Sequence, residues 1–100
     1  MVKHIILWQL KDDLTDKEAV KAAIKAGLEG LRGKIPGLME IGVVTEGRLE
    51  SSNADLMLDS TFEDEQSLQG YAVHPDHVAV ADNMVRPNVK SRVCMDYIVS

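Results

Sequence analysis

The spacing of apolar residues changes several times along this chain, and the order of these changes restricts its fold more than any other feature. Residues 2–10 (VKHIILWQL) have the character of an extended strand with apolar residues on both faces. Residues 89–99 alternate again, with Val89, Val93, Met95, Tyr97 and Val99 on one face. Residues 39–45 and 54–61 are also strand-like, and the segment between them, EGRLESSN, is rich in turn formers. The sequence therefore predicts four strands, the middle two of which form a hairpin with a long loop.

Two helical regions separate these strands. The first follows Thr15, which together with Glu18 matches a capping box, and its apolar residues recur every three or four positions until the region near Gly33. The second opens with the sequence FEDE at residues 62–65, whose carboxylates favour the positive end of a helix dipole. Pro75 is expected to stop that helix and to begin a short third one that runs to about Val85, because proline suits the first helical position.

The resulting order, β-α-β-β-α-α-β, predicts an α+β fold of the ferredoxin-like, split β-α-β type, with helices on one face of a four-stranded antiparallel sheet. We treat residues 1–100 as a single domain. In the first strand, Ile5 and Leu7 lie on the face opposite to His4 and Trp8, and no helix is left to cover them. An uncovered apolar sheet face indicates an interaction surface. We therefore expect a homodimer whose two sheets pack face to face.

The charge balance argues against two classes of partner. The formal net charge is −5 and the sequence pI is about 5.0, so nucleic acid and anionic membrane surfaces would be repelled. The apolar run within the first ten residues is too short for a signal peptide or a membrane span, and it is interrupted by the polar residues His4 and Gln9. The single cysteine, Cys94, is interpreted as a packing residue in a protein of the reducing cytoplasm.

The stretch YAVHPDHV, residues 71–78, admits two interpretations. In the structural one it joins two helices, with His74 at the cap, Pro75 at the bend and Asp76 at the new helix start. The spacing of His74 and His77 does not favour a metal site, because the residue before a proline is extended and the two rings need not converge.

In the functional interpretation, the same stretch contributes an acid–base site. His77 would lie in the first turn of a helix, where partial positive charge keeps the imidazole neutral and able to accept a proton. Tyr71 precedes it by six residues and can donate its phenol O–H to a carbonyl or oxyanion. His4, on the same strand face as Trp8, is expected to point into the same cleft between sheet and helices. The sequence thus favours a pocket for a small hydrophobic carbonyl compound.

Three segments, VKHIILWQLK, KIPGL and FEDEQSLQGYAVHPDHVAV, resemble the stress-responsive A/B barrel (Dabb) family over essentially the whole chain. The resemblance implies a ferredoxin-like dimer whose two sheets form a dimeric α+β barrel. Most members have no assigned reaction, some are stress-responsive oligomers, and one branch performs cofactor-free aldol cyclisation of a polyketide with a histidine base and a tyrosine. By position these roles fall on His77 and Tyr71, with His4 in support. The pocket would also include Trp8, His74 and Asp55, the last standing where the cyclising branch carries another histidine.

Some members of the family hold a magnesium ion by main-chain oxygens after the first helix. By position these oxygens belong to Arg32, Ile35 and Leu38, where unpaired carbonyls lie at the negative pole of the helix. No other cofactor is expected, since the sequence contains no dinucleotide fingerprint, phosphate loop or nucleophile elbow. Three functions stay open: a binding protein for a small carbonyl compound, a cofactor-free cyclase or lyase, and a non-catalytic stress-response oligomer.

Overall fold

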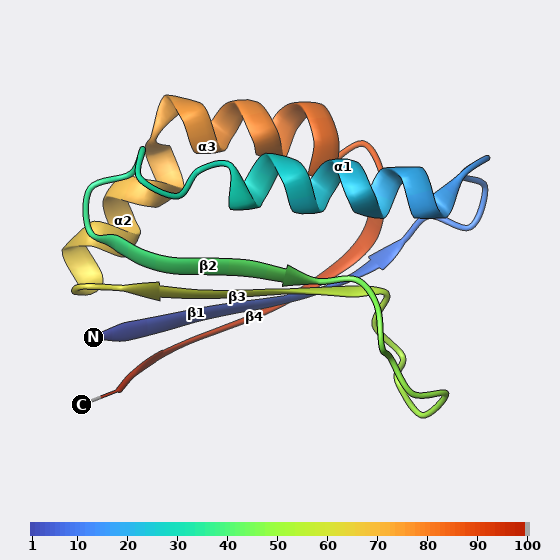
Figure 1. The fold of residues 1–100 in the computed structure, drawn as a ribbon, viewed down its shortest axis with the longest axis horizontal. Helices are drawn as coiled ribbons and strands as arrows, with labels where there is room; N and C mark the ends of the chain where they lie inside the picture. Colours follow the sequence, from blue (N-terminus) through green and yellow to red (C-terminus); the bar gives the residue numbers. More distant parts are fainter. Residues whose placement is uncertain (100) are drawn as a thin grey trace.

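The computed structural model, which describes residues 1–99, has the order of elements that the apolar spacing predicts (Figure 1). The bounds are β1 Val2–Leu10, α1 Lys17–Glu29, β2 Leu38–Val44, β3 Leu56–Phe62, α2 Glu65–Val73, α3 Pro75–Val80, a π-helical turn η1 Ala81–Val85, and β4 Val89–Ile98. None of the helices within residues 1–99 combines the length and the apolar character needed to cross a bilayer.

The four strands form one antiparallel sheet in the order β2-β3-β1-β4, and all the helices lie on one of its faces (Figure 1). This is the ferredoxin-like α+β arrangement expected from the sequence. Alternate residues of the central strand β1 point toward the helices and are buried there. Together with α1 and the neighbouring strands they build the core, whose β1 members are Val2, Ile6, Trp8 and Leu10.

The start of α1 differs from the predicted capping box. Asp16, not Thr15, is the N-cap, and its Oδ1 accepts a hydrogen bond from the Ala19 N–H at 3.0 Å. A carboxylate at this position also interacts favourably with the positive end of the helix dipole, which a threonine hydroxyl does not. The regular helix ends at Glu29, and turns continue the chain through the predicted end region.

The cap assignment gives a direct test. Replacing Asp16 with Ala should lower the free energy of unfolding by about 1 kcal/mol. The Ala19 N–H would lose its hydrogen-bond acceptor, and the positive end of the helix dipole would lose the nearby negative carboxylate. Thr15→Ala, the matched control, should change the free energy of unfolding far less. Urea unfolding followed by circular dichroism measures both. Equal losses at the two positions would restore Thr15 as the cap.

One strand register departs from the simple alternation expected for β4. The pairing of β1 with β4 shifts between Gln9 and Leu10, and Leu10 pairs with Val89. Val89 therefore packs against the core on the helix side. It had been expected on the same face as Val93, and that prediction is wrong because a bulge moves one residue to the other face.

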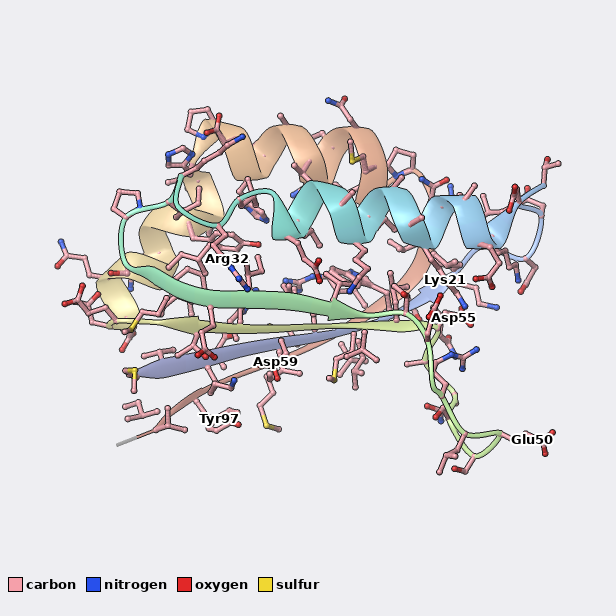
Figure 2. The ribbon with its side chains drawn as sticks, viewed as in Figure 1. Lys21, Arg32, Glu50, Asp55, Asp59 and Tyr97 are labelled. Carbon is pink, nitrogen blue, oxygen red and sulfur yellow. The ribbon has the colours of Figure 1, made fainter. Side chains whose placement is uncertain are left out.

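The sheet face away from the helices is apolar and uncovered, as the alternation in the first and last strand segments of the sequence, residues 2–10 and 89–99, predicts. Met95 pairs with Ile5 and Val93 with Leu7, and Met95 is 65% exposed. Figure 2 shows Tyr97 and Asp59 projecting from this face. We call it the open sheet face; its apolar members are Ile5, Leu7, Val44, Met57, Val93, Met95 and Tyr97.

An ion pair lies within this apolar surface. Lys3 Nζ is 2.6 Å from Asp59 Oδ1 and donates to Thr61 Oγ1 at 3.1 Å. The hydrogen bond to Asp59 raises the pKa of the lysine, so its ammonium group stays charged at neutral pH. Because the ammonium and the carboxylate neutralise each other, this pair can be buried without leaving either of its two charges alone in an apolar contact.

Candidate functional site

A cavity of about 960 Å³ lies between the helix-side face of β1 and β4 and the segment from α2 to η1. His4, Trp8, Tyr71 and His77 all line it. The sequence expectation that these four residues share one cleft is thus matched by their positions; which of them act on a ligand stays a prediction. The walls are mostly apolar, and the exposed residues of β4 mark the side on which the cavity meets solvent.

In the wall of the cavity, the ring of Tyr71 contacts the other aromatic side chains of the site. Its side chain is 1% exposed, and its ring stacks on that of His77 with centroids 4.0 Å apart. The ring of Phe62 packs against the tyrosine at 5.0 Å. Within residues 1–99, Tyr71 Oη has no hydrogen-bond partner. Burial raises the pKa of the phenol, which therefore remains a neutral O–H donor.

His77 has the neutral ring that the sequence analysis expected, but for a different main reason. Its pKa is lowered chiefly by burial, while the nearby backbone carbonyls of Ala72 and Tyr71 act in the opposite direction. Its Nδ1 is buried and has no hydrogen-bond partner among the described residues. The helix that carries it, α3, has only six residues and continues into the π-helical turn η1, not as a regular helix to Val85.

His4 is held by the neighbouring strand. It pairs directly with Asp96 of β4, and His4 Nδ1 donates to Asp96 Oδ1 at 2.5 Å. On its other side, the Ser60 hydroxyl donates to the His4 carbonyl at 2.8 Å. The ring lies edge-on to Tyr71 with centroids 5.9 Å apart. A carboxylate acceptor on Nδ1 fixes the tautomer and the orientation of the ring.

Two residues expected in the pocket lie outside its lining. Asp55 precedes β3 at the other end of the sheet, where its Oδ2 accepts from the Leu10 N–H at 2.7 Å and holds the loop in place. His74 caps α3, its Nδ1 accepting from the Asp76 N–H at 3.1 Å, as the structural interpretation of this stretch predicts. The backbone of His74 is extended because Pro75 follows, and its ring accepts from the Asp76 N–H and does not line the cavity.

The main-chain magnesium site remains a prediction. Arg32 and Ile35 lie in the connection from α1 to β2 and Leu38 is the first residue of β2; the Leu38 N–H donates to the Ile35 carbonyl at 3.2 Å. A carbonyl oxygen has two lone pairs, so this hydrogen bond leaves Ile35 able to coordinate an ion.

Three residues of β4 contribute to the cavity although the sequence did not lead us to predict them. Arg92, Cys94 and Asp96 all line the cavity. The strand period of two puts them on one face, opposite Val93 and Met95, so the same alternation that revealed the open sheet face could have found them. Cys94 had been interpreted as a packing residue, but it is exposed. Although the residue is exposed, partial burial of its sulfur and the neighbouring Asp96 carboxylate raise the pKa of the Cys94 thiol.

The sequence of residues 2–99 matches the model of a known protein family, "Stress responsive A/B Barrel Domain". The chain belongs to the Dabb family. A sequence relative, a stress-response A/B barrel domain-containing protein of Arabidopsis thaliana, is 30% identical over 99 residues. That match covers 98% of this Dabb chain but only 36% of the length of the Arabidopsis protein.

Solved structures agree on the architecture. A dimeric ferredoxin-like protein of unknown function from Bacteroides fragilis is 33% identical, with a TM-score of 0.85 and coverage of 96% and 93% of the two chains. A dimeric ferredoxin-like protein from Thermobifida fusca is 25% identical, with a TM-score of 0.79 over 98% and 90%. Hydroxynitrile lyase from Passiflora edulis shares the fold at 19% identity, with a TM-score of 0.73 over 99% and 93%.

Proposed function

We propose that this Dabb chain forms a homodimer through its open sheet face and binds a small apolar carbonyl compound in the cavity under the helices, with His77 as general base. The observation that carries the proposal is a pair of buried polar atoms, Tyr71 Oη and His77 Nδ1, without partners among residues 1–99. Buried polar groups normally have a hydrogen bond, so a ligand oxygen or proton is a natural partner for this pair.

The chemistry follows from the protonation states. A neutral His77 imidazole takes a proton from the carbon next to the ligand carbonyl; the C–H bond breaks and its electrons form the enolate. The Tyr71 phenol donates a hydrogen bond to the developing oxyanion, and in a water-poor cavity this bond is stronger than in water. His4, oriented by Asp96, adds a second polar group edge-on to the tyrosine. The enolate can then add to a second carbonyl or collapse with loss of a leaving group.

Two neighbours of the same fold support a catalytic role. One is a hydroxynitrile lyase and another, at 16% identity and a TM-score of 0.76, is a putative antibiotic biosynthesis monooxygenase from Nitrosomonas europaea. At these identities they establish only that the fold can carry enzyme activity. The proposed class for this chain is therefore argued from its own unpartnered phenol and imidazole.

The test is hydrogen–deuterium exchange of a carbon acid. Phenylacetone in D₂O, followed by NMR, should exchange its methylene protons faster with the protein than with buffer alone. His77→Gln should lower the protein-dependent rate by about a hundredfold, because general base catalysis typically contributes about that much or more. His74→Gln, the matched control outside the cavity, should leave the rate unchanged. Equal rates for wild type and His77→Gln would remove the proposed base.

The pH profile provides an independent check. Burial holds the pKa of His77 below its ordinary value of 6.5, so the base form persists to lower pH than for a free imidazole. The exchange rate should stay on its plateau as pH falls through 6.5 and decline only at lower pH. A decline centred at or above 6.5 would show that another group is the base.

A second candidate is a non-catalytic stress-response oligomer, which the extent of the uncovered open sheet face favours. In that case the dimer forms, and phenylacetone exchange in the presence of the protein equals that of buffer.

A further inference from the structure

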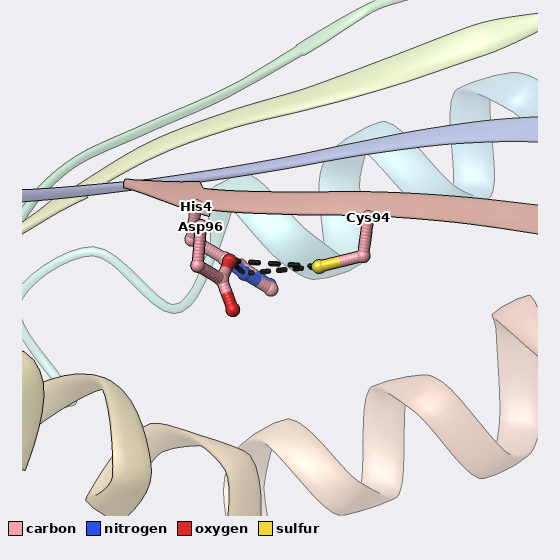
Figure 3. A group of neighbouring side chains, drawn as sticks. All are labelled: His4, Cys94 and Asp96. Atoms are coloured by element: carbon pink, nitrogen blue, oxygen red, sulfur yellow. Dashed lines mark hydrogen bonds and ion pairs between the residues drawn. The ribbon is translucent and has the colours of Figure 1, made fainter. Parts of the chain in front are cut away.

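Three metal-binding side chains from opposite ends of the sequence meet on the helix side of the sheet. His4 and Asp96 are directly paired on β1 and β4, and Cys94 lies two residues before Asp96 on the same face. Cys94 Sγ is 3.8 Å from His4 Nδ1 and 3.5 Å from Asp96 Oδ1. Figure 3 shows the three side chains pointing from the sheet toward α2 and α3. A nitrogen, a sulfur and an oxygen donor thus all lie within 4.8 Å of one another.

We propose that His4 Nδ1, Cys94 Sγ and an Asp96 carboxylate oxygen bind one divalent transition-metal ion of the Zn²⁺ type in the wall of the cavity. The inference goes beyond the proposed function and does not depend on it, since it concerns the binding of an ion and not the reaction of a carbonyl compound. It is also separate from the main-chain oxygens of Arg32, Ile35 and Leu38.

The spacing of the donors fits tetrahedral coordination after a small movement. Zinc bond lengths of about 2.0–2.3 Å place neighbouring ligand atoms roughly 3.3–3.6 Å apart at tetrahedral angles. The two contacts of Cys94 Sγ, at 3.8 and 3.5 Å, are already close to that spacing. Only the 2.5 Å contact between His4 Nδ1 and Asp96 Oδ1 must open, by roughly 0.8 Å. Asp96 is on an exposed edge strand and can make that adjustment by rotation of its side chain.

The donor set indicates which metal is favoured. Thiolate sulfur and imidazole nitrogen select zinc, copper and cobalt, whereas magnesium and calcium require oxygen donors. Three protein ligands leave a fourth position for water or for a ligand, which is the arrangement of reactive zinc sites and not of closed structural ones. Because all three residues line the cavity, the ion would lie within the same space as Tyr71 and His77.

The charges around the cluster are close to balanced. A thiolate and a carboxylate together offset the two positive charges of the ion. Arg92, on the same strand face, partly offsets the effect of burial and of Asp96, which raise the pKa of the Cys94 thiol, but it also repels the cation. Binding must displace the proton of the Cys94 thiol, and the proton that His4 Nδ1 donates to Asp96 must move to Nε2 so that the Nδ1 lone pair can bind the ion. Because the thiol proton is released, the affinity should increase as pH rises.

The experiment uses the untagged, chelator-treated protein under reducing conditions, titrated with Co²⁺ and, by competition, with Zn²⁺. Wild type should bind one ion per chain and develop a thiolate-to-cobalt charge-transfer band in the near ultraviolet. Cys94→Ala should abolish the band and weaken Zn²⁺ binding at least about a hundredfold. Substitution of a residue that only hydrogen-bonds to a metal ligand already lowers metal affinity by about tenfold or more, and loss of a ligand itself should cost more. Asp96→Asn should weaken binding by about tenfold or more. His74→Gln, which removes a histidine outside the cluster, should change neither.

The outcomes separate this proposal from the one before it. Absence of the charge-transfer band in wild type, less than one ion per chain, or equal weakening by Cys94→Ala and His74→Gln overturns the metal site. Because Cys94 and Asp96 are exposed, their substitution should not disrupt the core, and circular dichroism of each variant is the check that it is folded. Phenylacetone exchange is measured with chelator present, so the acid–base proposal stands or fails without reference to the ion.

Discussion

Met95→Asp is expected to convert the proposed homodimer into a monomer. Met95 is 65% exposed on the open sheet face, and Met95 and Ile5 pair on adjacent strands. In a dimer with two-fold symmetry, one substitution places a carboxylate on each of the two packed sheets. An unpaired charge in an apolar interface costs several kcal/mol, and Lys3 is already paired with Asp59. The dissociation constant should therefore rise by about a thousandfold or more.

Sedimentation velocity at micromolar concentration measures this change. Wild type should sediment with twice the chain mass of 11.0 kDa and Met95→Asp with the chain mass itself. Val73→Asp is the matched control, because Val73 is 75% exposed but lies on α2, on the helix side of the molecule. That variant should remain a dimer. A monomeric wild type, or a dimer unaffected by Met95→Asp, would contradict packing through the open sheet face.

The open sheet face could be predicted from the sequence because it depends only on alternation. Ile5 and Leu7 differ in direction from His4 and Trp8 by the geometry of a strand, whatever the rest of the chain does. The position of Val89 could not be predicted in the same way, since a bulge between Gln9 and Leu10 depends on how two distant strands align. The local alternation of apolar residues therefore predicts the sheet face on which most strand residues lie. A residue such as Val89, which a bulge moves to the other face, can be placed only from the pairing of the two strands.

The candidate site was predictable to a similar limit. The sequence placed Tyr71 and His77 on either side of the Pro75 bend, but the stacking of their rings depends on the angle between α2 and α3. The cause of the lowered His77 pKa, burial, likewise depends on packing around the ring. The cluster at β4 joins positions from opposite ends of the chain, and only the register of β1 against β4 shows that Cys94 and His4 meet.

Phe62→Ala should have the largest effect on stability and should also alter the site. Phe62 is fully buried at the end of β3, and its ring packs against Tyr71 at 5.0 Å and lies edge-on to His4 at 6.3 Å. Truncation removes most of a buried ring and leaves a cavity, which costs about 3–5 kcal/mol of unfolding free energy. Because the vacated space adjoins the cavity, water can then approach the stacked pair of Tyr71 and His77. The pKa of His77 should move upward, toward its ordinary value of 6.5, as desolvation is relieved.

Leu10→Ala separates the two effects. Leu10 is also buried in the core, but it lies at the opposite end of β1 from His4 and does not line the cavity. Its loss should destabilise the fold by about 2–5 kcal/mol while leaving the titration of His77 unchanged. Urea unfolding gives the first quantity, and NMR titration of the imidazole protons gives the second. If Phe62→Ala shifted neither, or if both variants shifted His77 equally, the phenylalanine would be an ordinary core residue. A shift confined to Phe62→Ala would mean that core packing sets the protonation state of His77.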